Sequence, residues 1–207
     1  MDIYYTSLLS IAAFCLGACP FSVFIGKFLL HKDIRHYGDG NPGAFNVFRA
    51  GGRKAGILAL VVEIGKGVPF VFLSHSVYDL AGVPVAVIGI SAILGHAFSP
   101  FLKFKGGKAL AVTGGVILAL PLYNVFLAFM LLLFLAFLFI EVDSWIIMFG
   151  TGGTLIYVIT TTGYSWETFF MASVFVILAI KHFDDLCTFP TFRIKVLNLI
   201  HVRRNKN

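Results

Sequence analysis

The sequence predicts an all-α integral membrane protein with about seven transmembrane helices, the N-terminus outside and the C-terminus cytoplasmic. Hydrophobic residues make up 58% of the 207 positions and charged residues only 13%, about half of what a globular chain carries. The mean hydropathy is +0.91. Because each spanning helix needs about 20 apolar residues, the chain has room for five to seven spans. We therefore expect residues 1–207 to form a single polytopic membrane domain.

Seven apolar runs define the expected helices, at residues 5–30, 55–73, 83–97, 109–122, 125–140, 145–162 and 167–181. Pro121 and Asn124 divide the stretch 109–140, which as one helix would be about 48 Å long against a hydrocarbon core of about 30 Å. One broken or tilted helix is the alternative there. No lysine or arginine precedes the first run, so it is predicted to be a retained span rather than a signal peptide.

The basic residues are distributed asymmetrically. If the N-terminus is outside, the inner segments are the loops 31–54, 97–108 and 141–144 and the tail from Lys181. These segments, together with Lys27 at the adjoining helix end, contain every lysine and arginine of the chain except Lys66. This positive-inside pattern places both polar loops in the cytoplasm, where they can draw on cytosolic substrates. The net charge of +6 then indicates contact with anionic membrane lipids rather than nucleic acid.

Three features outside the loops are open to two interpretations. Lys66 lies within the second run with Glu63 three residues before it, either as a functional intramembrane charge or as a pair that fixes helix packing. The three cysteines have no metal-ligand spacing and are interpreted as apolar packing residues, with disulfide or thiol chemistry as the alternative. The basic cytoplasmic tail, 193–207, is expected to be an amphipathic surface helix or an unstructured segment.

The first polar loop, GDGNPGAFNVFR, has the composition of a phosphate site. Its glycines permit backbone conformations that direct N–H groups to one point, its asparagines supply amide donors, and its arginine can bind phosphate through two donors. A plain connecting turn would need fewer glycines. The candidate ligand-binding residues are Gly38, Gly40, Asn41, Gly43, Asn46 and Arg49.

The second polar loop, GHAFSPFLKFKGGK, combines a histidine with clustered lysines. His96 is a candidate general base because its unperturbed pKa lies near physiological pH; a hydrogen-bonded packing role is the alternative. Lys105 and Lys108 flank Gly106 and Gly107 and can neutralise a second phosphate. These lysines can instead reflect the positive-inside rule alone.

Other chemistries have little support. The chain contains no HExxH, CxxC, GxSxG or Walker sequence, so we expect no metal site, no cofactor and no serine-hydrolase mechanism. The available groups suit group transfer without a covalent intermediate, which needs two substrates held close together and negative charge stabilised.

Together these two loops resemble those of the bacterial acyl-phosphate:glycerol-3-phosphate acyltransferases, the PlsY family. That family carries GSGNxGATNVxR followed by GHxxPxFxxFKGGKG, where this chain has GDGNPGAFNVFR and GHAFSPFLKFKGGKA. The resemblance runs from about Leu16 to Gly115. It implies a compact seven-helix fold in the bacterial plasma membrane with a cytoplasmic-side site. The implied reaction moves a fatty acyl group from acyl phosphate to glycerol 3-phosphate and gives lysophosphatidic acid.

Site residues follow from the matching motif positions. The resemblance implies that Arg49 and its loop bind the substrate phosphate, that Lys105 and Lys108 bind acyl phosphate, and that His96 does acid–base or orienting work. Gly95 and Pro100 also match.

The chain departs from the family pattern at several of these positions. Asp39 replaces a serine, Phe45 a threonine and Ala109 a glycine, and Asp185 stands in place of an asparagine near the C-terminus. Asp39 is a candidate acceptor for the hydroxyl proton, and Asp185 a candidate substrate contact. Two other functions remain open: a non-catalytic lipid-precursor-binding or regulatory paralogue, and a small transporter of phosphorylated metabolites.

Overall fold

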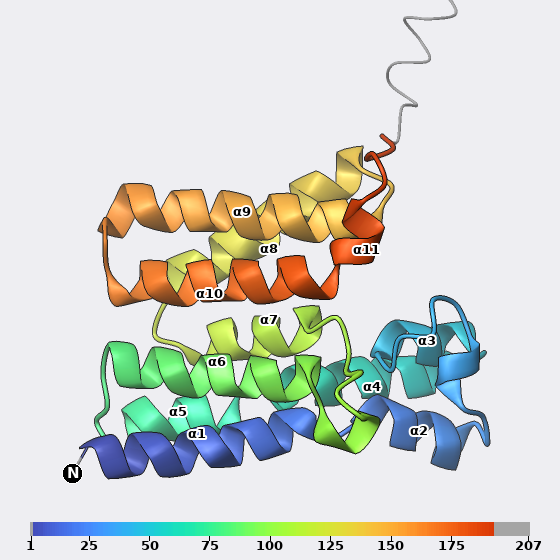
Figure 1. The fold of residues 1–207 in the computed structure, drawn as a ribbon, viewed down its shortest axis with the longest axis horizontal. Coiled ribbons are helices and arrows are strands. Elements are labelled where there is room, and N and C mark those ends of the chain that lie inside the picture. Colours follow the sequence, from blue (N-terminus) through green and yellow to red (C-terminus); the bar gives the residue numbers. More distant parts are fainter. Residues whose placement is uncertain (1, 193–207) are drawn as a thin grey trace, which may run out of the picture.

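The computed structural model describes residues 2–192, and within them nearly all regular structure is helical (Figure 1). The helices, in order, are α1 (Asp2–Ala18), α2 (Phe21–Leu29), η1 (Ile34–His36), α3 (Ala44–Arg49), α4 (Arg53–Gly65), α5 (Pro69–Ser76), α6 (Val83–Ala97), η2 (Pro100–Leu102), α7 (Leu110–Ala119), α8 (Tyr123–Phe139), α9 (Asp143–Thr162), α10 (Trp166–Lys181) and α11 (Phe183–Leu186).

Each predicted apolar run corresponds to one helix or to a broken pair of helices. The first run forms α1 and α2, which are separated at Cys19 and Pro20, where proline lacks the N–H that a continuous helix needs. The second run forms α4 and α5, with Pro69 opening α5. Pro121 separates α7 from α8. The predicted break of the stretch 109–140 is therefore confirmed.

Within residues 2–192, four helical segments are long and apolar enough to cross a membrane: Asp2–Leu29, Arg53–Ser76, Val83–Leu102 and Asp143–Thr162. The apolar helices α7 and α8 are shorter. With 10 residues, α7 extends only about 15 Å, half of a hydrocarbon core. The all-helical, apolar character is confirmed, and the count of seven spans stays a prediction.

The helices form stacked layers (Figure 1). α8, α9 and α10 pack together on one side, and α10 also contacts α6, which packs along α1. α1 and α6 approach so closely that a Cβ at Gly95 would overlap the backbone of Phe14; small residues at such contacts let helices in membranes pack tightly. α2, α3 and α4 extend from one end of this stack.

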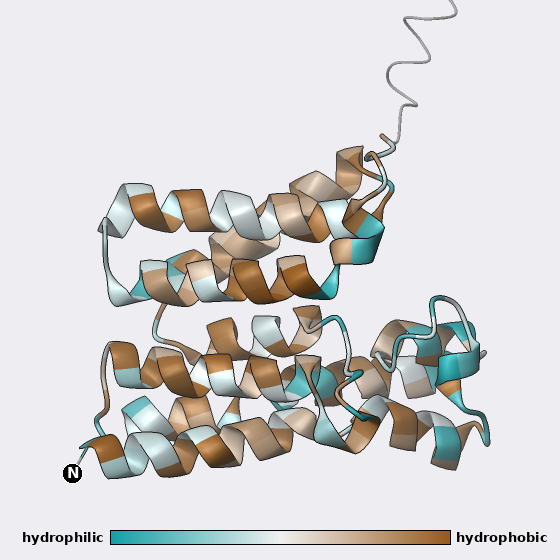
Figure 2. Ribbon diagram, viewed as in Figure 1, coloured by the Kyte–Doolittle hydropathy of each residue, from teal (hydrophilic) through white to brown (hydrophobic). Residues whose placement is uncertain are grey.

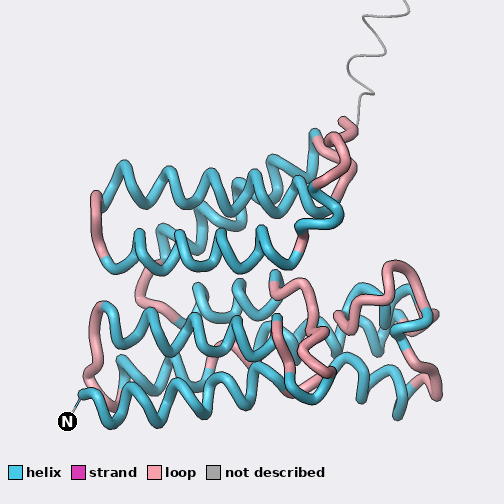
Figure 3. The backbone as a smooth tube through the Cα atoms, in the orientation of Figure 1, coloured by secondary structure: helices cyan, strands magenta, loops and turns pink. Residues whose placement is uncertain are grey.

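Polar loops collect at one end of the stack. The loop before α3, the loop between α6 and α7, and α11 lie at this end, whereas the N-terminus and the turn between α9 and α10 lie at the other (Figures 1 and 3). Figure 2 shows hydrophilic residues concentrated at the loop before α3 and at α11, with hydrophobic residues along the helices between the two ends. The two polar loops thus lie at one end of the stack, and which end faces the cytoplasm stays a prediction. The predicted basic tail, residues 193–207, lies outside the described residues.

The charged pair within the second run is buried. Lys66 Nζ lies 2.8 Å from Glu63 Oε2, and both side chains are 2% exposed. Glu63 also accepts hydrogen bonds from the backbone N–H and the hydroxyl of Ser22 on α2. The predicted pairing is confirmed, and it joins α4 to α2. The cysteines 15, 19 and 187 are free thiols.

Candidate active site

The glycine-rich loop folds back onto α3 and holds the side chains of that helix in place. Gly38 has a φ of +59°, which favours glycine, and a Cβ there would overlap the side chains of Asn46 and Arg49. Asn46 is buried and donates from Nδ2 to the carbonyl oxygen of Asn41 at 2.8 Å. Arg49 in turn donates to Asn46 Oδ1 at 3.2 Å. Donors of the loop and of α3 therefore meet at one point.

The Asp39 carboxylate lies at this point. Its Oδ1 accepts from the Asn41 backbone N–H at 3.2 Å and from Asn46 Nδ2 at 3.0 Å, and Arg49 NH1 is 3.8 Å away. Its Oδ2 lies 2.9 Å from Lys108 Nζ. Donors thus converge on one point, as an anion site requires, and a carboxylate of the chain itself occupies that point. Binding of a substrate anion by this loop stays a prediction.

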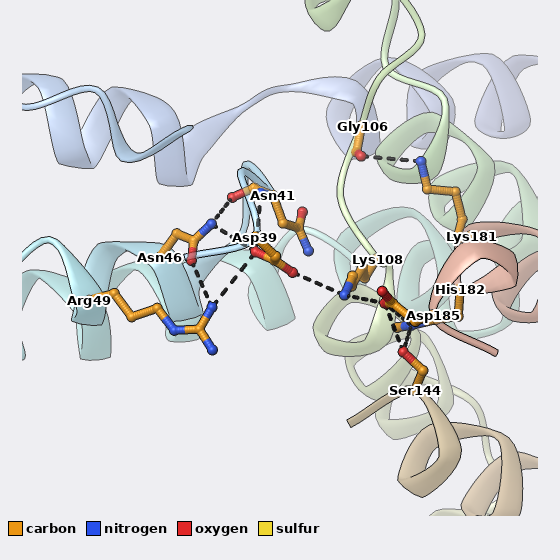
Figure 4. A network of polar contacts seen from close by, with 10 residues as sticks. All are labelled: Asp39, Asn41, Asn46, Arg49, Gly106, Lys108, Ser144, Lys181, His182 and Asp185. Atoms are coloured by element: carbon orange, nitrogen blue, oxygen red, sulfur yellow. Dashed lines mark hydrogen bonds and ion pairs between the residues drawn. The ribbon is translucent and has the colours of Figure 1, made fainter. Parts of the chain in front are cut away.

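Lys108 connects this loop to the C-terminal end of the structure (Figure 4). Its ammonium lies 2.8 Å from Asp185 Oδ2, in addition to its contact with Asp39. Ser144 at the start of α9 donates to the same Asp185 oxygen at 2.8 Å, and its hydroxyl lies 3.0 Å from His182 Nδ1. One lysine therefore links three segments that are far apart in the sequence.

These contacts shift the pKa values of the groups involved. Burial raises the pKa of Asp39, but hydrogen bonds from Lys108, Asn41 and Asn46 outweigh this and leave it below its usual value. The hydrogen bond from Lys108 likewise lowers the pKa of Asp185. Burial lowers the pKa of Lys108, but the two carboxylates more than compensate and raise it. Burial lowers the pKa of His182 to about 4, so His182 is neutral near pH 7 while the three other groups are charged.

A pocket of about 400 Å³ opens next to this network. Residues of the first loop and of α3, including Phe45, line its polar end. Lys108, Asp143 and His182 complete the lining there. Its wall is apolar and comes from α8 and α9: Met130, Leu133, Phe134, Phe137, Ile146 and Ile147. A pocket that joins charged donors to a hydrocarbon-like wall suits an amphipathic molecule with an anionic head and an apolar chain.

His96 does not line this pocket. It is 8% exposed, and its Nδ1 lies 3.1 Å from Glu63 Oε2, beside a separate cavity of about 10 Å³, which has room for about one water molecule. Its carbonyl oxygen accepts the N–H of Gly107 at 3.1 Å, and a Cβ at Gly107 would overlap the imidazole ring. His96 therefore supports the loop that carries Lys108.

The remaining predicted residues fall into two groups. Asn41, Gly43, Asn46, Arg49, Asp39 and Lys108 line the pocket. Asp185 joins them through Lys108, and Gly38 shapes their loop. Lys105 is exposed and does not line the pocket, and Gly106 accepts a hydrogen bond from Lys181 through its carbonyl oxygen at 3.2 Å.

Two residues of the network were not among the sequence-based candidates. His182 lines the pocket and Ser144 connects it to Asp185. A histidine directly after the last apolar run, one helical turn before Asp185, was the available signal for His182. No sequence signal marked Ser144 as part of the network, since a serine at the start of an apolar helix usually caps that helix.

The fold and this pocket define a helical membrane protein with an amphipathic pocket at one end of its helix stack. The family model described as glycerol-3-phosphate acyltransferase matches residues 7–188. The chain belongs to the glycerol-3-phosphate acyltransferase family.

Known relatives agree with this assignment. A glycerol-3-phosphate acyltransferase of Lactococcus lactis subsp. lactis is 38% identical over 189 residues, which cover 86% of this chain and 87% of the relative. One of Macrococcus caseolyticus is 44% identical over 113 residues, which cover 54% of this chain and 57% of the relative. With one of Enterococcus faecalis the match is also 44% identical and covers 51% of the relative. The chain thus spans little more than half the length of some relatives that it matches.

Solved structures of one protein share the fold. The crystal structure of PlsY (YgiH), an integral membrane glycerol 3-phosphate acyltransferase, in its glycerol 3-phosphate form superposes with a TM-score of 0.79 at 27% identity, covering 87% of this chain and 90% of that chain. Its lysophosphatidic acid form gives a TM-score of 0.77 at 26% identity, covering 87% and 89%.

Proposed function

We propose that this protein transfers a fatty acyl group from acyl phosphate to glycerol 3-phosphate and so makes lysophosphatidic acid for phospholipid synthesis. The observation that carries this proposal is the pocket in which Arg49, Lys108 and the glycine-rich loop meet an apolar wall from α8 and α9. An acyl phosphate has a matching shape, with its chain against the wall and its phosphate near the cations. The names of the relatives support the same reaction.

The reaction needs no covalent enzyme intermediate. The hydroxyl oxygen of glycerol 3-phosphate adds to the acyl carbonyl, the bond from that carbon to the phosphate oxygen breaks, and phosphate leaves with the proton. No serine or cysteine is among the pocket-lining residues of the described chain. Lys108 and Arg49 stabilise the negative charge of the phosphates, and a buried pocket strengthens such interactions relative to water.

We assign positioning roles to the other candidates. His96 orients the Gly106–Gly107 loop through its contact with Gly107, because Glu63 holds its ring in a site away from the pocket. Asp39 accepts hydrogen bonds from Asn41 and Asn46 and pairs with Lys108, and its lowered pKa makes it a weaker proton acceptor than an ordinary carboxylate. For Asp39 we therefore favour a role in placing Lys108 over the role of a general base.

We further propose that the site faces the cytoplasm of a bacterial plasma membrane. The support is the concentration of polar loops at one end of the helix stack, together with the excess of lysine and arginine in those loops. Both water-soluble glycerol 3-phosphate and membrane-embedded acyl phosphate can reach a pocket at such a position. Interaction with membrane lipids follows from the exposed apolar side chains of the helices.

Acyl transfer by the purified protein tests this function. Labelled glycerol 3-phosphate and palmitoyl phosphate are supplied, with Arg49→Ala as the test variant and Arg53→Ala, at the exposed start of α4, as its matched control. We expect lysophosphatidic acid from the wild type and the control, and little from Arg49→Ala. Binding of glycerol 3-phosphate without product would indicate a precursor-binding paralogue, and uptake into sealed vesicles a transporter.

A further inference from the structure

The loop that carries Lys108 needs contacts from outside to hold its shape. Residues 105–109 have no regular structure. On either side of its glycine pair, Lys103, Phe104 and Ala109 have φ values of +53°, +61° and +61°. This left-handed conformation is unfavourable for L-residues, and it persists where the surrounding structure imposes it.

One peptide group of this loop is bound at both of its ends. The peptide that joins Gly106 to Gly107 consists of the Gly106 carbonyl and the Gly107 N–H. The N–H donates to the carbonyl oxygen of His96 at 3.1 Å, and the carbonyl oxygen accepts from Lys181 Nζ at 3.2 Å. Two such bonds oppose rotation of a peptide between glycines, which is otherwise easy. Because Lys108 comes next, the orientation of this peptide sets the direction in which its side chain leaves the backbone.

Lys181 is itself held in place by two helices. It is the last residue of α10 and is partly buried. Its Nζ lies 5.3 Å from the centre of the Phe98 ring, directly after α6, in a favourable cation–π contact. α10 and α6 pack against each other. The hydrogen bond from Lys181 therefore ties the loop to the packing of these helices.

The end of α10 and the residues after it contact the loop at two points (Figure 4). Lys181 binds the Gly106 carbonyl, and Asp185 lies 2.8 Å from the Lys108 ammonium. The first contact fixes the backbone before Lys108, and the second fixes the end of its side chain. The position of the ammonium thus depends on both.

We propose that Lys181 is a positioning residue for acyl transfer, which fixes the Gly106–Gly107 peptide and thereby directs Lys108 into the pocket. The proposal rests on the acyl transfer proposed above. Lys181 does not line the pocket, so it acts through Lys108 and not on the substrate. Without its ammonium the peptide can rotate, and a small displacement of a catalytic group slows a reaction strongly.

Two substitutions of Lys181 test the proposal by acyl transfer from palmitoyl phosphate to labelled glycerol 3-phosphate. Lys181→Met removes the ammonium and keeps a chain of similar length, and kcat/KM should fall at least tenfold. Lys181→Arg retains a donor for the Gly106 oxygen and a cation for the Phe98 ring, and should stay within threefold of the wild type. Lys103→Met, exposed in the same loop, is the matched control and should stay within twofold.

A double-mutant cycle separates the positioning of Lys108 from a general loss of folded protein. Lys181→Met is introduced into the Lys108→Met protein, and kcat/KM is measured again. If Lys181 acts through Lys108, the further loss should be threefold or less, because coupled residues are not additive. A general loss of folded protein would lower kcat/KM by the same factor in both backgrounds.

Hydrogen exchange in detergent micelles gives a readout that needs no turnover. The segment that contains the Gly107 amide should exchange at least tenfold faster in Lys181→Met than in the wild type, because local opening exposes the amide. The amides of α9 should keep their wild-type rates in the same sample.

Three results would overturn the proposal: a Lys181→Met protein that keeps more than a third of wild-type kcat/KM, a tenfold further loss in the Lys108→Met background, or a wild-type exchange rate of the Gly107 segment. If the wild type forms no product, the proposed acyl transfer fails instead. The exchange rate then decides alone whether Lys181 holds the peptide.

Discussion

The Lys108 ammonium lies 2.8 Å from the Asp185 carboxylate, although the two residues are 77 positions apart in the sequence. The same ammonium contacts Asp39 in the glycine-rich loop. Lys108 thus connects the loop before α3, the loop before α7 and the segment after α10. Its two contacts hold Asp39 and Asp185 together at the polar end of the pocket.

Replacing Lys108 by methionine should abolish most of the acyl transfer. The change removes a cation from the site of charge stabilisation and leaves Asp39 and Asp185 without their shared partner, so we expect kcat/KM to fall at least 100-fold. Lys103→Met, in the same loop but exposed, should stay within twofold of the wild type. A Lys108→Met protein with more than a third of wild-type activity would rule out this role.

A methyl group at Gly107 should disturb the lysine loop through His96. The added Cβ would overlap the imidazole ring, so the loop must shift, and overpacking of this kind costs about 1–3 kcal/mol. Activity should fall tenfold or more, because displacement of a catalytic group by about 1 Å can cost 100-fold. Gly114→Ala on α7, where a Cβ would meet nothing within 4 Å, should leave both thermal stability and activity near wild-type values.

Removal of the Glu63 carboxylate should destabilise the fold. Glu63 binds Lys66, His96 and Ser22, and its side chain is 2% exposed. Glu63→Ala leaves the Lys66 charge buried without its partner, a change that typically costs about 3–5 kcal/mol. Denaturant unfolding in detergent micelles measures this loss. The exposed Glu141→Ala should change the free energy of unfolding by about 0.5 kcal/mol or less, and equal effects of the two variants would contradict the prediction.

Acid should weaken the fold through His182. Its pKa is lowered from 6.5 to about 4 by burial, so below pH 6.5 the unfolded chain binds a proton that the folded chain does not bind until about pH 4. Stability contributed by neutral His182 is therefore lost as the pH falls through this window, by about 3 kcal/mol in total. Unfolding curves at pH 7 and pH 4.5 should differ less for His182→Gln than for the wild type; the same difference in both proteins would refute the assignment.

The start of α7 should become more stable when Ala109 is replaced by glycine. Ala109 has a φ of +61°, a left-handed conformation that costs an L-residue about 1–2 kcal/mol. Ala109→Gly relieves this strain but adds freedom to the unfolded chain, so we expect a net gain of up to about 1 kcal/mol. Ala12→Gly, in the middle of α1, should instead lose about 1 kcal/mol, and thermal unfolding of the two variants compares them directly.

Much of the architecture was predictable because it depends on local composition. The run 83–97 coincides with α6, and the divided stretch 109–140 forms α7 and α8, since long apolar runs and prolines determine helices within a few residues. Asn46, Arg49 and Lys108 could be identified in the same way, because the donors and glycines of an anion site are adjacent in the sequence.

The sequence by itself therefore determined the helical membrane class, the two polar loops and most of the pocket's charged residues. Only the tertiary structure decided that His96 pairs with Glu63 away from the pocket, that His182 and Ser144 enter the network, and that Lys108 bridges two carboxylates. The physical reason is distance along the chain. Hydrophobic periodicity and turn composition act over a few residues, whereas the partner of a buried charge is set by how whole helices pack, and no local pattern records which distant side chain will meet it.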